Sequence, residues 1–235
     1  MQRKLITTAD GSHSLYVEGL DENYHSKHGA IQESLHVFIK MGLHHLTEKG
    51  MKEISILEIG LGTGLNALLT WIEAEKLDIN IRYTGLEAYP LEQEITDSLN
   101  YRELLTNNAP SGSAQSDAHD EVNEKYGAIH SSEWEKEIKL PGNFVLHKIK
   151  ESLQEVKLTG KYDLIYFDAF GPRVQPEMWT DEIFAKIFAL TNLGGVLVTY
   201  CSKGEVQRCM KRAGFTVEKV PGPPGKREMV RAIRL

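Results

Sequence analysis

Residues 54–66 read Ile-Ser-Ile-Leu-Glu-Ile-Gly-Leu-Gly-Thr-Gly-Leu-Asn, and this stretch decides the fold. An apolar run leads directly into Gly60, Gly62 and Gly64, and a helical pattern follows over residues 67–75. This order is typical of a buried strand that turns into a helix. Glycine accepts positive φ and has no Cβ, so a ligand can lie against the backbone and the free amide groups of the helix start. We therefore expect a small molecule to bind at this turn.

The spacing of the glycines narrows the choice of ligand. A dinucleotide-binding fingerprint places its third glycine five residues after the first, and Leu65 occupies that position. The spacing therefore disfavours a nicotinamide cofactor. A second strand-like run covers residues 79–86 and ends at Glu87, so a carboxylate follows the next strand. A tight turn with a purely structural role is the alternative, and Glu87 weakens it.

A further carboxylate closes a later strand. Residues 162–168 are nearly continuously apolar and end at Asp168, and Phe170 and Pro172 follow in the next loop. A carboxylate at the root of a loop stiffened by proline can accept a hydrogen bond from a nucleophilic amine. The alternative is that Asp168 only caps the turn at Phe170. In a doubly wound sheet, Asp168 would lie at the same strand ends as Gly60 and Glu87, where ligands bind.

Strand and helix patterns alternate over the rest of the chain. We expect strands from residue 54 to the glycine turn and at 79–86, 144–149, 162–168, 195–200, 216–220 and 229–234. We expect helices at 31–46, 67–76, 91–105, 151–156, 180–189 and 205–213. This alternation predicts an α/β fold, a Rossmann-like, doubly wound sheet of seven mostly parallel strands with right-handed crossovers.

Two segments depart from this alternation. Near the N-terminus, strand-like runs at 4–8 and 14–17 flank an Ala-Asp-Gly-Ser turn, which predicts a β-hairpin. We expect residues 1–30 to form this hairpin and a substrate loop, and residues 31–235 to form the main domain. The segment at about 107–136 is rich in Ser, Asn, Asp, Gly and Ala, and we interpret it as an insertion or mobile lid with a helix only at 117–126.

Composition and charge restrict the possible partners. The 235 residues are 26% charged and 41% apolar, as in ordinary globular proteins. No apolar run is long enough to span a bilayer and the start lacks a signal-peptide core, so we expect a cytoplasmic protein without a membrane partner. The net charge is −6, but residues 203–235 hold nine Lys or Arg against three Glu. That basic third is compatible with a phosphate-contacting face or with a solvated surface.

The cysteines and histidines do not form a metal-binding pattern. Cys201 and Cys209 are eight residues apart, and we interpret them as reduced packing residues. His25, His28 and the pair at positions 44 and 45 lack carboxylates or thiols at ligand spacing. We therefore expect hydrogen-bonded or solvated histidines and no metal.

The motifs resemble those of class I S-adenosylmethionine-dependent methyltransferases. Glu58 and the glycines after it are similar to the first motif of that family. Longer stretches resemble the methyltransferase domain of the bifunctional enzymes of tRNA 5-methylaminomethyl-2-thiouridine biosynthesis, namely residues 10–12, 24–38, 168–172, 176–180, 194–204, 213–215 and 222–229. Those enzymes also carry a flavin-dependent oxidoreductase domain. Because this sequence has no second glycine fingerprint, we expect a stand-alone methyltransferase form.

The resemblance implies roles for individual residues. S-adenosylmethionine would lie over the glycine turn, with Glu87 on the ribose hydroxyls. The implied cofactor-binding residues are Glu58, Gly60, Gly62, Gly64, Asn66, Glu87 and Asp168. Asp168 would also be the catalytic residue, orienting the substrate amine and accepting its proton.

The implied substrate is 5-aminomethyl-(2-thio)uridine at the wobble position of tRNA. An extruded base needs aromatic walls, and phosphates need cations. The implied substrate-binding residues are Tyr24, Ser26, Phe170, Pro172, Lys203, Lys226 and Arg227. For Trp179 a core position is favoured. A separate oxidoreductase acting upstream is a further candidate partner.

Two other functions stay open. An aminopropyltransferase of the polyamine type shares the sheet and a Tyr-His motif, but the loop after Asp168 lacks the paired aspartates that grip a diamine. A catalytically silent tRNA-binding module is the other, and the intact carboxylates and glycines disfavour it.

Overall fold

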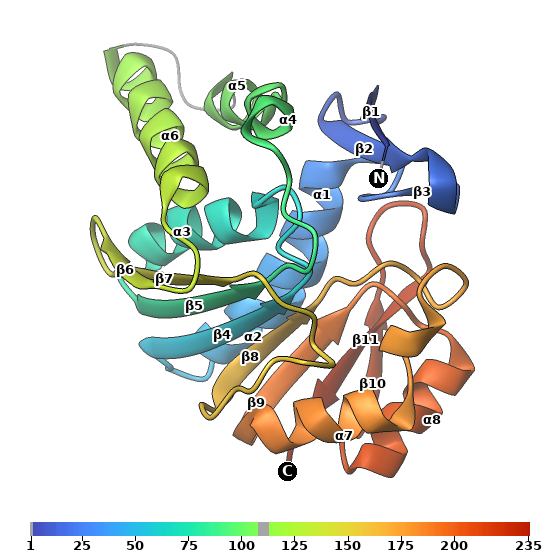
Figure 1. The fold of residues 1–235 in the computed structure, drawn as a ribbon. Coiled ribbons are helices and arrows are strands. Elements are labelled where there is room, and N and C mark those ends of the chain that lie inside the picture. Colours follow the sequence, from blue (N-terminus) through green and yellow to red (C-terminus); the bar gives the residue numbers. More distant parts are fainter. Residues whose placement is uncertain (1, 108–112) are drawn as a thin grey trace.

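The computed structural model describes residues 2–107 and 113–235, and within them a large sheet forms the centre of the molecule (Figure 1). Its strands follow the order β10-β11-β9-β8-β4-β5-β7-β6. They are β4 (Glu53–Ile59), β5 (Asn80–Leu86), β6 (Glu137–Leu140), β7 (Phe144–Ile149), β8 (Tyr162–Phe167), β9 (Thr191–Thr199), β10 (Thr216–Pro221) and β11 (Glu228–Ile233). The five strands from β9 to β7 pair in parallel. Strand β11 pairs antiparallel with both β9 and β10, so β10 runs in the same direction as the five, and β6 pairs antiparallel with β7 at the other edge. The doubly wound α/β class is confirmed, with β6 as an edge strand beyond the seven expected.

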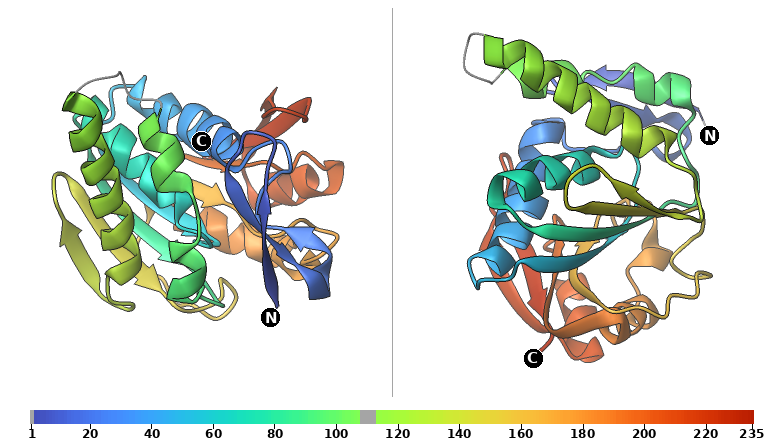
Figure 2. Two further views of the ribbon diagram at one scale, coloured as in Figure 1. Left: turned by 90° about the horizontal axis from the view of Figure 1, so that it is seen from above. Right: turned by 90° about the vertical axis from the view of Figure 1, so that its left-hand side faces the viewer.

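Helices cover both faces of the sheet (Figures 1 and 2). One face carries α3 (Leu65–Leu77) and a helical rod built of α1 (Ala30–Ser34), the π-helix η2 (Leu35–Leu43) and α2 (His44–Thr47). The other face carries α7 (Asp181–Leu190) and α8 (Gly204–Ala213). Strand β8 alternates between the two cores: Tyr166 packs on the α3 side and Phe167 on the α7 side. Burial on both faces explains why this strand is continuously apolar.

The N-terminal segment is the predicted hairpin, extended by a third short strand. Strands β1 (Arg3–Thr7), β2 (His13–Val17) and β3 (Glu22–Asn23) form a separate antiparallel sheet, with the 3-10 turn η1 (Glu18–Leu20) between β2 and β3. The hairpin turn caps the start of α1, because the Asp10 carboxylate accepts from the Gln32 N–H and the Ser12 hydroxyl accepts from the Ala30 N–H. The segment is thereby fixed beside the carboxyl end of the sheet.

Two predicted helices are wrong in extent. The single helix expected at 91–105 is divided into α4 (Gln93–Asp97) and α5 (Tyr101–Asn107). Between them, the Asn100 side chain accepts from the His13 N–H and donates to the Gly11 carbonyl, so docking against the hairpin breaks the helix. The helix expected at 151–156 is a single turn in which the Val156 N–H donates to the Ser152 carbonyl.

A third helix is longer than the sequence indicates. Residues Ser113–Ser131 form α6, which lies beside α3 (Figure 2). Val122, Tyr126 and Ile129 recur at helical spacing and are buried, and this narrow stripe explains how so polar a segment packs. The interpretation of about 107–136 as an insertion or lid stays a prediction, and residues 108–112 of it lie outside the described residues. Among the helices described, none has the length and apolarity to cross a membrane.

Candidate active site

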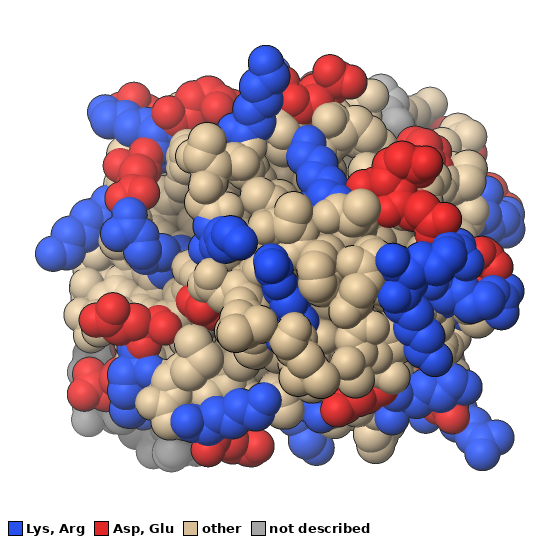
Figure 3. Space-filling model, turned by 90° about the horizontal axis from the view of Figure 1, so that it is seen from below, with Lys and Arg blue, Asp and Glu red and all other residues tan. Residues whose placement is uncertain are grey.

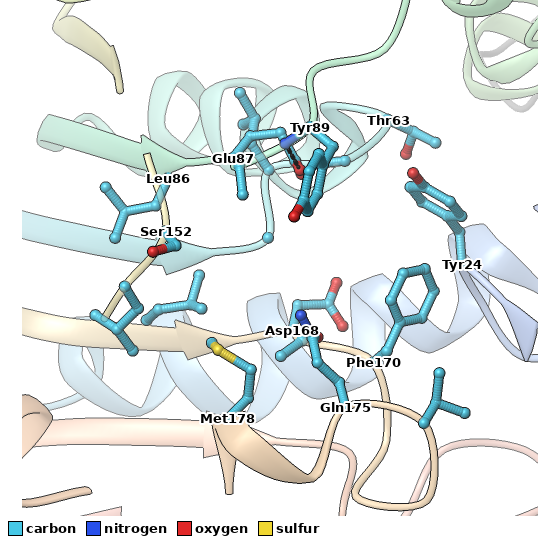
Figure 4. A pocket seen from close by; sticks show the side chains of 18 of the residues that line it. Tyr24, Thr63, Leu86, Glu87, Tyr89, Ser152, Asp168, Phe170, Gln175 and Met178 are labelled. Carbon is cyan, nitrogen blue, oxygen red and sulfur yellow. Dashed lines mark hydrogen bonds between the residues drawn. The ribbon is translucent and has the colours of Figure 1, made fainter. Parts of the chain in front are cut away.

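A cavity of about 520 Å³ opens where β4, β5 and β8 end. Gly60, Glu87 and Asp168 line it together, at the strand ends where the sequence predicts them. Figure 4 shows Leu86 and Met178 toward one end of the cavity, Tyr24 and Phe170 toward the other, and Asp168 between them. The cavity therefore has an aromatic end at Tyr24 and Phe170, a mixed polar and apolar end that includes Leu86 and Ser152, and a carboxyl group between them.

The glycine turn brings the backbone close to its neighbours. Gly60 has φ of 90°, and a Cβ there would lie 2.8 Å from the Asp168 carbonyl oxygen. Gly62 has φ of 49°, and a Cβ there would lie 3.3 Å from the Tyr24 ring. Both positions need glycine, because the conformation is left-handed and the space is filled.

Glu87 ties the loop after β5 to the glycine turn. One carboxylate oxygen accepts from the Gly62 N–H at 2.9 Å, and the other accepts from the Tyr89 N–H at 2.9 Å. Glu87 therefore fixes the geometry of the turn as well as lining the cavity.

Asn66 links two carboxyl groups. Its amide nitrogen donates to Glu58 at 2.8 Å and to Asp168 at 2.9 Å. Glu58 also accepts from the Tyr83 hydroxyl at 2.8 Å. Glu58 is fully buried and does not line the cavity, so the structure places it behind Asn66 rather than at the ligand. Burial raises the pKa of Glu58 well above its usual range.

The surroundings of Asp168 make its carboxyl titrate near neutrality. Burial is the largest cause, and together with the Glu33 carboxylate it raises the pKa of Asp168 to about 7. The hydrogen bond from Asn66 and the charge of Lys226 act in the opposite direction. A carboxyl group with this pKa can both accept and release a proton at physiological pH.

Aromatic side chains form the other end of the cavity. Tyr24 and Phe170 meet edge to face with ring centroids 5.2 Å apart, and the Tyr24 hydroxyl accepts from Arg3 at 3.0 Å. The Tyr200 hydroxyl donates to the Ala169 carbonyl at 2.8 Å. Trp179 is buried in the core, as expected, and its indole N–H donates to the Phe170 carbonyl. That bond and the 3-10 turn η3 (Pro176–Met178) hold the loop after β8.

Several residues assigned by resemblance lie outside the cavity wall: Ser26, Gly64, Pro172, Lys203, Lys226 and Arg227. Gly64 precedes α3 and lies against His130 of α6, and Ser26 donates its N–H to Glu33. Lys226 is half-buried and is already engaged, because its ammonium group pairs with Glu33 at 2.8 Å and lies over the Tyr200 ring. Lys203 and Arg227 are exposed, so they are the better candidates for phosphate contact.

Ion pairs engage five of the nine basic side chains in residues 203–235. The paired cations and their partners are Arg208 with Glu205, Arg212 with Asp181 and Glu205, Lys219 with Glu228, Lys226 with Glu33, and Arg231 with Glu218. Among the described residues, Lys203, Lys211, Arg227 and Arg234 keep no acidic partner, and Arg234 donates to the Phe188 and Thr191 carbonyls instead. Figure 3 shows one face of the molecule, where Lys and Arg are interspersed with Asp and Glu.

Comparison with known proteins identifies the family. A family model described as "S-adenosyl-L-methionine-dependent methyltransferase" matches residues 112–234. The chain belongs to this family. Its methyl donor is S-adenosyl-L-methionine, as the sequence predicts.

This methyltransferase is similar to proteins named "tRNA 5-methylaminomethyl-2-thiouridine biosynthesis bifunctional protein MnmC". It is 29% identical to the protein from Aromatoleum aromaticum over 236 residues, which are 97% of this chain and 35% of that protein. It is 31% identical to the protein from Leptospira borgpetersenii over 222 residues, which are 89% of this chain and 32% of that protein. The chain thus spans about a third of the length of these relatives.

Two solved structures share the fold of this methyltransferase. MNMC2 from Aquifex aeolicus superimposes with a TM-score of 0.74 at 24% identity, over 99% of this chain and 70% of that chain. Spermidine synthase from Thermotoga maritima reaches a TM-score of 0.50 at 11% identity, over 99% of this chain and 71% of that chain. At these identities the likeness concerns the fold alone, so the sheet does not decide between methyl and aminopropyl transfer.

The cavity of the methyltransferase suits its donor. The glycine turn leaves room that a Cβ would fill, and Glu87 adds a carboxylate beside it. The Asn66 side-chain oxygen is buried and has no hydrogen-bond partner among the described residues, so it is free to accept from a ligand. These features fit a cationic ligand with amine and hydroxyl donors.

The cavity-lining residues that sequence patterns do not reveal include Arg3, Tyr89, Tyr200 and Met178. Tyr89 lies two residues after Glu87 and could have been found from that position. Arg3 lies at the start of a hairpin and Tyr200 follows β9, and neither pattern differs from that of ordinary surface or core residues. Only the folded chain brings them to the cavity.

Proposed function

We propose that this methyltransferase methylates the exocyclic amine of 5-aminomethyl-(2-thio)uridine at the wobble position of tRNA. The observation that carries the proposal is the Asp168 carboxyl in an aromatic-walled cavity beside the glycine turn. The similarity to the MnmC proteins over most of this chain supports tRNA as the substrate.

The residues that would hold the donor surround the glycine turn. Backbone of Gly60 and Gly62 would lie under the methionine and ribose part, Glu87 would take the ribose hydroxyls, and Asn66 would offer its free side-chain oxygen. When bound, S-adenosyl-L-methionine supplies a methyl group on a cationic sulfonium. Glu58 keeps Asn66 oriented from behind.

Asp168 is the proposed acceptor for the proton of the substrate amine. A primary alkylamine is largely protonated at neutral pH, and only its neutral form has the lone pair that attacks a methyl group. Asp168 accepts this proton, and the neutral amine is then ready to form a nitrogen–carbon bond. The donor would supply the methyl group by cleavage of its carbon–sulfur bond and would leave as a neutral thioether. A pKa of about 7 makes Asp168 a suitable acceptor in the physiological range.

The aromatic end of the cavity would receive the base. A modified base must leave its stack to reach an enclosed site, and aromatic rings then replace the neighbouring bases. Tyr24, Phe170 and Tyr200 line the cavity near Asp168 and would also keep water from the reacting nitrogen. Holding the amine in line with the methyl group is the main contribution expected from this wall.

A transfer assay tests the proposal. The pure protein is incubated with labelled S-adenosyl-L-methionine and tRNA that lacks the methyl group, and the nucleosides are then separated. We expect label in 5-methylaminomethyluridine or its 2-thio form. Labelled decarboxylated donor with putrescine tests the aminopropyltransferase alternative, and tRNA binding without transfer of label would indicate a silent module.

We propose that an oxidoreductase activity acts upstream and supplies the amine. The curated relatives are named bifunctional, and the chain matches about a third of their length. Methylation of tRNA that already carries the aminomethyl group should need no flavin, whereas tRNA with a substituted amine should react only after the upstream enzyme is added.

A further inference from the structure

A partly buried ion pair lies behind the cavity wall. The Glu33 carboxylate of α1 and the Lys226 ammonium of the loop before β11 are 2.8 Å apart, although 193 positions separate them in sequence. The Glu33 side chain is 10% exposed and that of Lys226 is 34% exposed. The second Glu33 oxygen accepts from the Ser26 N–H, so both oxygens are engaged.

The ion pair touches the cavity wall from outside. Lys226 Nζ lies 4.1 Å from the centroid of the Tyr200 ring, and Tyr200 lines the cavity. The Tyr200 hydroxyl donates to the carbonyl of Ala169, the residue after Asp168. Neither Glu33 nor Lys226 lines the cavity itself, so both act on the ligand only through other residues.

The titratable groups around Asp168 come from several elements. Glu58 and Tyr83 face it from β4 and β5, and Tyr200 faces it from the end of β9. Glu33 and Lys226 act on it from behind the wall. Lys226 is the only cation among these groups in the described part of the chain. Burial and the Glu33 carboxylate favour a neutral Asp168, and the hydrogen bond from Asn66 and the charge of Lys226 oppose them.

We propose that Glu33 and Lys226 are positioning residues that set the charge of Asp168: Lys226 keeps it able to ionise, and Glu33 keeps it basic. This inference rests on the proposed function, in which Asp168 accepts a proton from an amine. A buried carboxyl without a cation would stay protonated and could not accept, whereas one beside an unpaired cation would be too weak a base.

The test measures the pKa of Asp168 directly and needs no methyl transfer. Carbon-13 NMR follows the side-chain carboxyl carbons as a function of pH, and the Asp168 signal is assigned from its absence in Asp168→Asn. Lys226→Met should raise the pKa of Asp168 by at least about half a pH unit, because a nearby cation is removed. Glu33→Gln should lower it, because Lys226 then lacks its partner.

Matched variants separate charge from packing. Lys226→Arg keeps the cation, so Asp168 should have the same pKa in this variant as in the natural protein. Lys219→Met removes a lysine of the same hairpin that pairs with Glu228, and it should leave Asp168 unchanged. Shifts of opposite sign in Lys226→Met and Glu33→Gln support the proposal. No shift, or shifts of the same sign, overturns it, and if Lys226→Met does not fold, Glu33→Gln and Lys226→Arg decide.

The same variants in the transfer assay keep the two proposals distinguishable. The acidic limb of kcat/KM against pH should move in the direction of the NMR titration. If the tRNA is not methylated but the NMR shifts have opposite signs, the proposed substrate is wrong and the coupling stands.

Discussion

Asn66 holds Asp168 by a hydrogen bond, and the Glu58 carboxyl group in turn holds Asn66. Asn66 donates to Asp168 and Glu58, so the orientation of the catalytic candidate depends on two buried residues behind it. Replacing Asp168 by Asn keeps the shape of the side chain and removes the proton acceptor. We expect kcat to fall by about 10²-fold or more. Calorimetry should still detect S-adenosyl-L-methionine binding, and retained turnover would remove Asp168 from the chemistry.

The raised pKa of Asp168 also predicts two pH dependences. Activity should rise with pH through about 7, because only the carboxylate accepts a proton. The contribution of Asp168 to the free energy of unfolding should change in the opposite direction. Because the pKa of Asp168 in the folded protein is above its ordinary value of 3.8, this contribution is fully present below about pH 4 and is lost as pH rises through about 7. Asp168→Asn should therefore raise Tm relative to the natural protein more at pH 8 than at pH 5. Equal differences at both pH values would contradict the shift.

A substitution of Gly60 tests whether the close approach of the glycine turn to the Asp168 carbonyl matters beyond the left-handed backbone conformation. Gly60 and Gly50 have φ of 90° and 87°, but a Cβ would meet the Asp168 carbonyl at Gly60 and open space at Gly50. Both alanine variants should lose stability from backbone strain, by more than about 1 kcal/mol. Gly60→Ala should lose more in chemical denaturation and should also lose donor binding. Equal losses would mean that strain alone explains the glycine.

At the scale of elements, the N-terminal hairpin is a cover for the cavity. Arg3 of β1 donates to the Tyr24 hydroxyl and to the Tyr89 carbonyl, and so joins the hairpin to the loop after β5. Arg3→Ala should weaken donor binding about 2- to 10-fold, the value of one or two hydrogen bonds. Lys4→Ala is the matched control, because Lys4 pairs with Glu18 outside the cavity. The Kd from calorimetry should change in Arg3→Ala and not in Lys4→Ala.

At the scale of the whole molecule, ion pairing determines which basic side chains are left to contact a phosphate. Lys203 and Arg227 are exposed and keep no acidic partner among the described residues, whereas Lys219 is paired with Glu228. Replacing Lys203 and Arg227 by Ala should weaken tRNA binding and reduce the slope of log K against log salt by about 1 for each phosphate that is no longer neutralised. Lys219→Ala should leave that slope unchanged. An unchanged slope in the double variant would place the tRNA elsewhere.

Local patterns predict the elements that carry the donor site. Burial on both faces makes a central strand recognisable, and glycine at a strand end is required by backbone geometry, so β4 and its turn follow from residues close in sequence. Helices are less predictable where distant contacts decide them. Asn100 breaks one helix by bonding to the hairpin, and α6 is stabilised by three apolar residues in a polar segment.

By itself, the sequence determined the α/β class, the glycine turn, and carboxylates at the ends of two parallel strands. Only the tertiary structure decided what surrounds those carboxylates: Asn66 between Glu58 and Asp168, Arg3 on Tyr24, and the ion pair of Glu33 with Lys226. The physical reason is the separation along the chain over which each kind of interaction acts. Strand and turn propensities act between neighbours in the chain, whereas the charge of a buried carboxyl depends on burial and on groups that only folding brings near it.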